Sequence, residues 1–351
     1  MNLRNRFFLI IFPLLSILAS CGAEEPVDIV AAPSEPASSN TTRDEPASPE
    51  FGSFGVDLTN QNTDIRPGDD FFMFANGTWV DNYELPDDRS SHSTPETLRD
   101  TSNERVQVIV DDLTSLEPAD GSLERKVSDY YLTYMDVDTL NQLGMSPLLP
   151  NLAAIESISS RQELITAFGR ARVDNTASPV NFSISTDRSD PDQHQLSLSV
   201  GGFSLPDRDY YLVDSERNLN IRKEFVEHVA RILSLAGIED GADKADAILS
   251  LETRIAEFTW PRAQRRNRDL TYNPMNFDDF ITEYPGFDWE RFFSSAGVEN
   301  LEDLNVIYPS AMSPTIDLVN DVSIEDWKSL MTYRLVNDSA RFLSEEIDNE
   351  S

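Results

Sequence analysis

From residue 55 onward, the hydrophobic and polar positions follow mainly the period of an α-helix. Apolar residues recur every three or four positions in several stretches, which predicts amphipathic helices that each bury one face. The expected inward faces are Val106, Ile109, Val110 and Leu113; Val127, Tyr130, Tyr131, Tyr134 and Met135; Leu164, Ile165 and Phe168; Phe225, Val226, Val229, Ile232 and Leu233; Ala245, Ile248, Leu249, Glu252, Ile255 and Ala256; and Trp327, Met331 and Leu335.

Capping residues place the ends of several of these helices. A serine or threonine followed three residues later by glutamate is typical of a capping box, and this pattern occurs at Thr101–Glu104 and at Ser160–Glu163. Gly237 suits the C-terminal cap of a helix predicted over residues 222–236, and Ser323 is expected to start the last helix.

One region alternates with the period of two that is typical of a β-strand. Its two halves are separated by a polar turn at residues 190–192, which predicts a β-hairpin. We therefore predict a mainly α, multihelical fold with one small β-hairpin. The alternating positions are Val180, Phe182 and Ile184, then Leu196, Leu198 and Val200.

The first twenty residues have the order of parts found in an export signal. A basic start is followed by an apolar run over residues 7–18, which is too short to span a bilayer, and by small residues. Residues 18–21 match the bacterial lipobox, in which the cysteine is lipidated, so Cys21 is the predicted lipidation site. An ordinary secretory signal with an incidental cysteine, or a buried apolar segment, is the alternative.

The segment that follows predicts a tether. Residues 21–54 are poor in large apolar side chains and rich in Pro, Ser, Thr, Ala and Glu, a composition typical of disorder. The expected organisation is a signal peptide at 1–20, a lipidated tether at 21–54 and a folded helical domain at 55–351. Gly22 after the cysteine favours the outer membrane, so we expect an exported lipoprotein that faces the periplasm or the cell surface.

Charge narrows the possible partners. There are 62 acidic residues against 28 basic ones, and the net charge of −34 would repel phosphate backbones, so nucleic acid is not an expected partner. The acidic excess could attract cationic peptides, although a solvated surface explains it as well. With Cys21 lipidated, no thiol is left for a disulfide, a metal site or a nucleophile.

Motifs for catalysis are missing from the sequence. A catalytic zinc site usually needs two histidines one helical turn apart, but His92, His194 and His228 have no histidine within a turn. We interpret His228 as a helix-surface residue and the other two as loop or strand-edge residues. Residues 202–206 begin like the turn that carries a nucleophilic serine but end in proline, so Ser204 is interpreted as structural.

Two segments combine residue types in a pattern that helix packing alone does not require. Residues 67–79 combine an Asp-rich helix start, aromatic anchors and an Asn-Gly pair that we expect to stop the helix. Residues 205–212 read Leu-Pro-Asp-Arg-Asp-Tyr-Tyr-Leu, a charged turn closed by two tyrosines. Taken alone, each is more often packing than function.

Together with other blocks, these segments resemble the neprilysin and endothelin-converting enzyme family of zinc endopeptidases, which includes bacterial oligopeptidases. The resemblance runs in order from Gly55 to the end of the printed sequence. The blocks are Pro67 to Trp79; Leu85-Pro86; Tyr131 to Asp136 with Leu143-Gly144; Leu205 to Leu212; Leu251 to Ala256; Tyr272-Asn273; and Trp327 to Arg334.

The resemblance implies a two-lobed, largely helical peptidase that encloses a cavity for small peptides. Its zinc ligands, an HExxH helix and a Glu-x-x-x-Asp helix, and its substrate-binding strand lie in a C-terminal part that this sequence does not contain. No catalytic or metal-binding residue is therefore carried over, substrate-binding residues stay unknown, and no cofactor is expected in this chain, although zinc is expected for the full-length family enzyme.

The leading hypothesis is the lid and cavity-wall half of a lipid-anchored zinc endopeptidase, truncated before its zinc site and inactive alone. An interrupted or split reading frame, or a shortened sequence, would explain this. Expected partners are the membrane, through the lipid on Cys21, and a missing catalytic lobe or peptide ligands. The alternatives are a non-catalytic peptide-binding lipoprotein and a purely structural surface lipoprotein.

Overall fold

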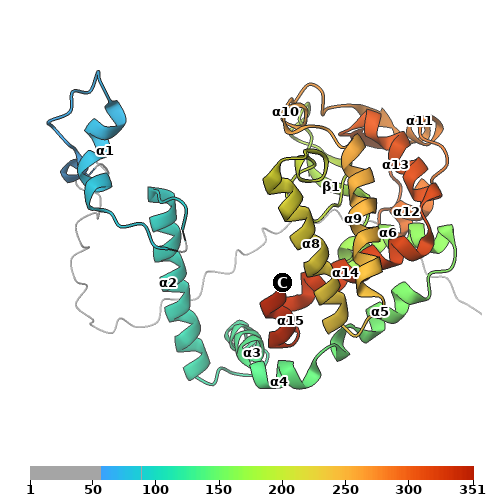
Figure 1. Ribbon diagram of the computed structural model, residues 1–351, viewed down its shortest axis with the longest axis horizontal. Coiled ribbons are helices and arrows are strands. Elements are labelled where there is room, and N and C mark those ends of the chain that lie inside the picture. Colours follow the sequence, from blue (N-terminus) through green and yellow to red (C-terminus); the bar gives the residue numbers. More distant parts are fainter. Residues whose placement is uncertain (1–56, 88) are drawn as a thin grey trace, which may run out of the picture. The chain divides into compact units, whose positions relative to one another are not determined.

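The computed structural model describes residues 57–87 and 89–351 (Figure 1). Cys21, the predicted signal peptide and the predicted tether at 21–54 lie outside the described residues. The chain divides into two compact units, Met1–Thr97 and Leu98–Ser351, which are described one at a time. The described part is mainly helical, with fifteen α-helices and one four-stranded sheet, so the predicted mainly α class is confirmed.

The first unit contains a short 3₁₀ helix, Leu58–Asn60, and α1, Phe71–Asn82. The Asp70 carboxylate caps α1 by accepting a hydrogen bond from the Met73 N–H at 2.9 Å, as the Asp-rich start predicts. The predicted stop at Asn-Gly is wrong, because α1 continues through Gly77 to Asn82. Gly77 allows close packing instead: a Cβ there would lie 2.7 Å from the Cβ of Asn62.

The second unit begins with helices that we call the arm: α2 (Thr94–Ser115, here from Leu98), α3 (Leu123–Met135) and α4 (Val137–Leu143). The predicted capping box at Thr101 is wrong, because Thr101 lies inside α2. Helix α3 is capped by the Ser122 hydroxyl, which accepts a hydrogen bond from the Arg125 N–H at 3.1 Å.

The apolar residues of the arm are not buried. Leu123, Val127, Tyr130 and Tyr134 recur at helical spacing along α3, and all four are exposed. Among the described side chains of α2, α3 and α4, only Ser128 is buried. The prediction that these α2 and α3 faces point inward is therefore wrong: the period is helical, but the stripe stays exposed, with only Tyr134 at its end in ring contact with Phe342.

The remainder of the second unit, residues 149–351, is called the body. Its helices are α5 (Leu149–Glu156), α6 (Arg161–Asp174), α7 (Asp209–Leu212), α8 (Glu216–Leu235), α9 (Gly241–Phe258), α10 (Arg262–Arg265), α11 (Phe277–Glu283), α12 (Trp289–Ser295), α13 (Pro309–Asp321), α14 (Ile324–Ser339) and α15 (Glu345–Glu350). A 3₁₀ turn at Ser146–Leu148 precedes α5, and another at Ala340–Phe342 follows α14.

The core of the body forms where α8, α9 and α14 pack against one another (Figure 1). Val229, Ile255 and Trp327 are fully buried there, as the helical periods predict. Helix α8 starts at Glu216, six residues before its predicted beginning, because Ser215 supplies an N-cap. Gly237 follows it with φ +74°, the left-handed conformation that a C-terminal cap requires.

The predicted β-hairpin is confirmed. Strands β1 (Val180–Thr186) and β2 (His194–Val200) pair antiparallel, with Phe182 opposite Leu198. The sequence did not indicate β3 (Pro274–Asn276) and β4 (Asp303–Val306), which extend the sheet in the order β1-β2-β4-β3. Strands of three or four residues are too short to establish a period of two.

None of the described helices combines the length and apolar character needed to span a bilayer.

Candidate functional site

The histidines do not form a metal centre. His92 lies in the loop before α2, 2.9 Å from the Thr97 hydroxyl, and stacks on Tyr83 with 4.4 Å between ring centroids. His194 starts β2, where it pairs with Thr186. Among the described residues, no group of three or more His, Cys, Asp or Glu is arranged to hold a metal ion. These donors do not fit the catalytic zinc that the resemblance implies for a complete enzyme.

His228 was predicted to lie on a helix surface but bridges three helices. Its Nδ1 is 2.9 Å from the Glu350 carboxylate of α15, and its Nε2 is 3.0 Å from the Asn337 amide oxygen of α14. Arg231 also contacts Glu350 at 2.9 Å. The histidine therefore helps to hold α15 against α8, a packing role that its sequence neighbours could not indicate.

Three of the blocks that carry the resemblance meet at one buried carboxylate. Glu252 of α9 is fully buried and accepts hydrogen bonds from both the backbone N–H and the hydroxyl of Ser204, at 3.0 and 2.7 Å. Its other oxygen accepts the Tyr211 hydroxyl at 2.7 Å. Arg334 of α14 donates to the Ser204 hydroxyl at 3.2 Å. We call these four residues the Glu252 cluster.

Backbone geometry closes the turn that supplies Ser204 and Tyr211. Gly202 has φ +95°, and a Cβ there would lie 2.5 Å from the Ser178 carbonyl oxygen, so only glycine fits. The Leu205 N–H donates to the Tyr211 hydroxyl at 2.7 Å. Both hydroxyls that reach Glu252 are thus held by a second contact, Ser204 by Arg334 and Tyr211 by the Leu205 N–H, and the interpretation of Ser204 as structural agrees with this geometry.

Burial controls the electrostatics of the cluster. Removal from water raises the pKa of the Glu252 carboxyl, despite the hydrogen bonds from Tyr211 and Ser204 that favour its ionised form. Burial, and then the adjacent Glu252, also raise the pKa of the Tyr211 hydroxyl. Glu252 is fully enclosed and all its contacts are internal, so the chemistry of the cluster suits support of the fold and not catalysis.

A second buried carboxylate anchors the same turn. Asp207 is buried and forms ion pairs with Arg265 and, at 3.5 Å, with Arg262, both from α10. Arg208 donates at 3.1 Å to the Ala256 carbonyl near the end of α9. Asp207 and Arg208 of the 205–212 segment are therefore used for local anchoring.

The Tyr272-Asn273 block supports the edge of the sheet. The Asn273 N–H donates to the Asn305 side-chain oxygen at 2.6 Å, and the Asn273 amide donates to the Val306 carbonyl at 2.9 Å. Tyr272 donates to Asp187 in the hairpin turn at 2.8 Å. This block joins β4 to the hairpin turn.

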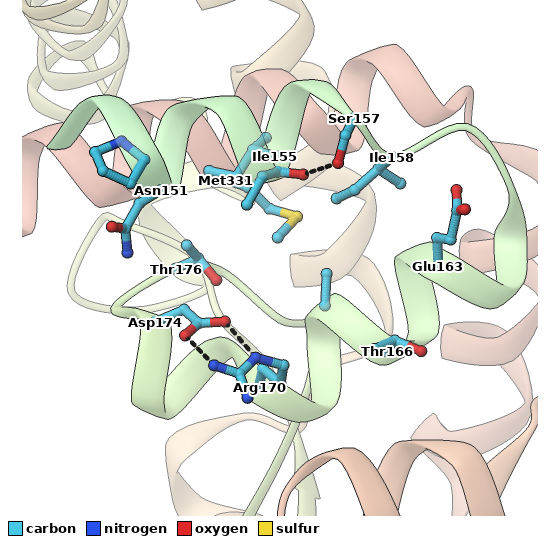
Figure 2. Close-up of a pocket in the computed structure, with 13 residues that line it drawn as sticks. Asn151, Ile155, Ser157, Ile158, Glu163, Thr166, Arg170, Asp174, Thr176 and Met331 are labelled. Carbon is cyan, nitrogen blue, oxygen red and sulfur yellow. Dashed lines mark hydrogen bonds and ion pairs between the residues drawn. The ribbon is translucent and has the colours of Figure 1, made fainter.

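The body also contains an open pocket, of about 460 Å³, between α5 and α6 (Figure 2). Ile155, Ile158 and Met331 line it with buried apolar surface, and an ion pair between Arg170 and Asp174 lies at its edge. We call it the α5–α6 pocket. None of these residues was predicted from the sequence to form a site.

Comparison with known proteins gives consistent results. Residues 67–351 match the N-terminal model of peptidase family M13. An endothelin-converting enzyme homolog of Locusta migratoria is 26% identical over 309 residues, which are 82% of this chain and 42% of that protein. Endothelin-converting enzyme-like 1 of Mus musculus is 25% identical over 66% of this chain and 31% of its own length.

Solved structures extend the similarity to the fold. A crystal structure of Mycobacterium tuberculosis zinc metalloprotease ZMP1 in complex with inhibitor is 28% identical, with a TM-score of 0.76 over 84% of this chain and 46% of that one. PEPO from Lactobacillus rhamnosis, 17% identical with a TM-score of 0.64, is similar in fold alone. The chain thus spans less than half the length of these relatives.

Proposed function

Because the chain belongs to peptidase family M13, we propose that its described part is the non-catalytic lobe of a zinc metalloendopeptidase. In this proposal the body walls a cavity that admits small peptides, and a separate catalytic lobe carries the zinc. The resemblance blocks that meet at Glu252 support it, because the cluster holds a rigid turn and not a reactive group.

The arm supplies the observation that carries the proposal. Leu123, Val127, Tyr130 and Tyr134 form an exposed apolar stripe along α3, and contiguous exposed apolar surface of this kind marks an interaction site. We assign this stripe to contact with the catalytic lobe. The argument is the same whether that lobe continues the polypeptide or is a separate chain.

A test of the arm uses the purified chain and a dye that fluoresces on exposed apolar surface. We expect the double variant Val127→Glu and Tyr130→Glu to lower dye binding and self-association, because two charges interrupt the stripe. Leu219→Glu is the matched control, since Leu219 is an exposed leucine in the body. A chain that binds no dye and stays monomeric would contradict the assignment.

The proposal includes that the printed chain does not hydrolyse peptides alone. Its three histidines lie in different elements, and no group of His, Cys, Asp or Glu among the described residues is arranged to hold zinc and its activated water. Metal analysis and a quenched-fluorescent peptide assay on the purified chain test this. We expect neither stoichiometric zinc nor hydrolysis, and finding both would overturn the assignment of a non-catalytic lobe.

The anchor is a further part of the proposal and rests on sequence. We propose that Cys21 carries a lipid and that the chain is exported, with the lobe held near the outer membrane and facing the periplasm or the cell surface. Labelling with a fatty-acid analogue in cells tests it. Label that persists in Cys21→Ala would show that another position is modified.

A further inference from the structure

The α5–α6 pocket is built like a site for a small ligand (Figure 2). Its volume of about 460 Å³ lies within the roughly 300–1,000 Å³ that is usual for such sites. Packed helices normally fill the space between them with interlocking side chains, but α5 contributes Ala154 here and α6 contributes Ala167. Neither methyl group reaches across, and the buried side chains of Ile155, Ile158 and Met331 are left facing the space.

One end of the pocket carries polar groups without partners. The Thr176 hydroxyl oxygen is buried and makes no hydrogen bond in the described part of the chain, although buried hydroxyls are nearly always paired. The side-chain amide of Asn151 has no hydrogen bond to any described residue either. Figure 2 shows both side chains on the same side of the pocket, above the Arg170–Asp174 pair.

The turn after α6 explains how Thr176 reaches the pocket. Asn175 ends α6 in the left-handed conformation, with φ +53°, and its side chain donates to the Ser339 hydroxyl at 3.3 Å. The Thr176 N–H then bonds the Ala171 carbonyl at 2.8 Å. The backbone that carries Thr176 is therefore fixed beside the pocket.

The charges around the pocket disfavour an anionic ligand. Arg170 donates two hydrogen bonds to Asp174, at 2.8 and 2.7 Å, so its positive charge is already balanced. The Glu163 carboxylate also lines the pocket, and the whole chain carries a net charge of −34. An anionic head group would find no free cation and would be repelled.

We propose that the α5–α6 pocket binds a small uncharged amide with a branched aliphatic body, the chemistry of one apolar residue within a peptide. The ligand amide pairs with the Asn151 amide and the Thr176 hydroxyl, and its aliphatic body fills the space that Ala154 and Ala167 leave open. This proposal does not depend on the proposed function, because zinc content and hydrolysis do not report on the pocket.

The test is a titration of the purified full chain with N-acetyl-leucine amide, in which saturation-transfer NMR detects the bound ligand. We expect a dissociation constant of about 1 mM, as is reasonable for a ligand of about a dozen non-hydrogen atoms. N-acetyl-leucine has the same body but ends in a carboxylate, and it should bind about 10-fold more weakly.

Two pairs of variants localise the binding. Ala154→Leu fills the pocket and should abolish binding, whereas Ala153→Leu on the exposed, non-lining side of α5 should leave it unchanged. Thr176→Val removes the hydroxyl at nearly constant volume and should weaken binding about 10-fold, whereas Thr176→Ser should retain it. Circular dichroism melts confirm that each variant is folded.

Three results would each overturn the proposal. One is the absence of binding by the unmodified chain at ligand concentrations of tens of millimolar, roughly 10-fold above the expected constant. Another is equal binding by the Ala153 and Ala154 variants, which would place the ligand elsewhere. The last is N-acetyl-leucine binding as tightly as the amide, which would contradict the uncharged head group.

Discussion

The arm and the body of the second unit differ in what their apolar side chains contact. Ile109 of α2 is 57% exposed, whereas Ile255 of α9 is fully buried among helices of the core. The large buried hydrophobic residues of the described chain all lie between Ile155 and Ile347. Both regions are helical and amphipathic, so helical period alone does not decide whether a face is covered.

This difference indicates which part of the chain contributes most of the free energy of unfolding. Helices gain most of their stability in proteins from tertiary packing, and isolated helices of ordinary length are marginal in water. The body has that packing and the arm lacks it. We therefore expect substitutions in the body to change global unfolding and equivalent substitutions in the arm to change only local helix content.

The largest expected effect comes from two matched isoleucines. Ile255→Ala removes three carbon atoms from the core and should lower the free energy of unfolding by about 2–5 kcal/mol. Ile109→Ala should change it by less than about 0.5 kcal/mol, because the side chain is already in water. Urea denaturation followed by tryptophan fluorescence measures both. Similar losses in the two variants would mean that the arm is packed in solution.

The next effect concerns the Glu252 cluster. Glu252→Gln keeps the shape but replaces one of the two accepting oxygens with a donor, which faces the Ser204 or the Tyr211 hydroxyl. We expect the free energy of unfolding to fall by about 1–3 kcal/mol, the usual cost of an unsatisfied buried polar group. Glu124→Gln in α3 is the control, since that glutamate is exposed. An unchanged stability of the Glu252 variant would show that the cluster is dispensable.

The same carboxyl predicts a dependence of stability on pH. Burial raises the pKa of Glu252 above its ordinary value of 4.5, so between those two values the folded state keeps a proton that the unfolded state has lost. The contribution of Glu252 to the free energy of unfolding is therefore complete below its ordinary pKa. It falls as pH rises from that value to the raised pKa of the folded state, by about 1.4 kcal/mol for each unit between the two. Denaturation curves from about pH 5 upward should show this slope, and Glu252→Gln should remove it.

The smallest effect compares two helix caps. Ser160 caps α6 in the body through a capping box with Glu163, and Ser122 caps α3 in the arm. Ser160→Ala should lower the global free energy of unfolding by about 1 kcal/mol. Ser122→Ala should lower only the helical signal of the arm, since α3 makes little contact that global unfolding would break. If Ser122→Ala lowered the global free energy of unfolding more than Ser160→Ala does, the arm and the body would not differ in packing as described.

Sequence reasoning succeeded where local signals and burial agree. The capping box at Ser160, the β-hairpin and the inward face of α9 were predicted from spacing alone, and they are confirmed. It failed where the outcome depended on a distant neighbour. Thr101 begins no helix because α2 starts earlier, and Gly77 stops no helix because it packs on Asn62.

The candidate sites show the same limit. The sequence placed Glu252 on the apolar face of a helix, but it could not supply Ser204 and Tyr211, which are 48 and 41 residues away. The pocket was not predicted, because a cavity depends on side chains that fail to meet across two helices.

The sequence alone was enough for the mainly α class, for the longer amphipathic helices, for the resemblance to the peptidase family and for the prediction of a lipid on Cys21, which stays a prediction. These depend on local periodicity and short motifs. Only the tertiary structure decided that the apolar stripe of the arm stays exposed, that three family blocks meet at Glu252, and that α5 and α6 leave a pocket. Burial and cavities are properties of several segments together, so no single stretch of sequence contains them.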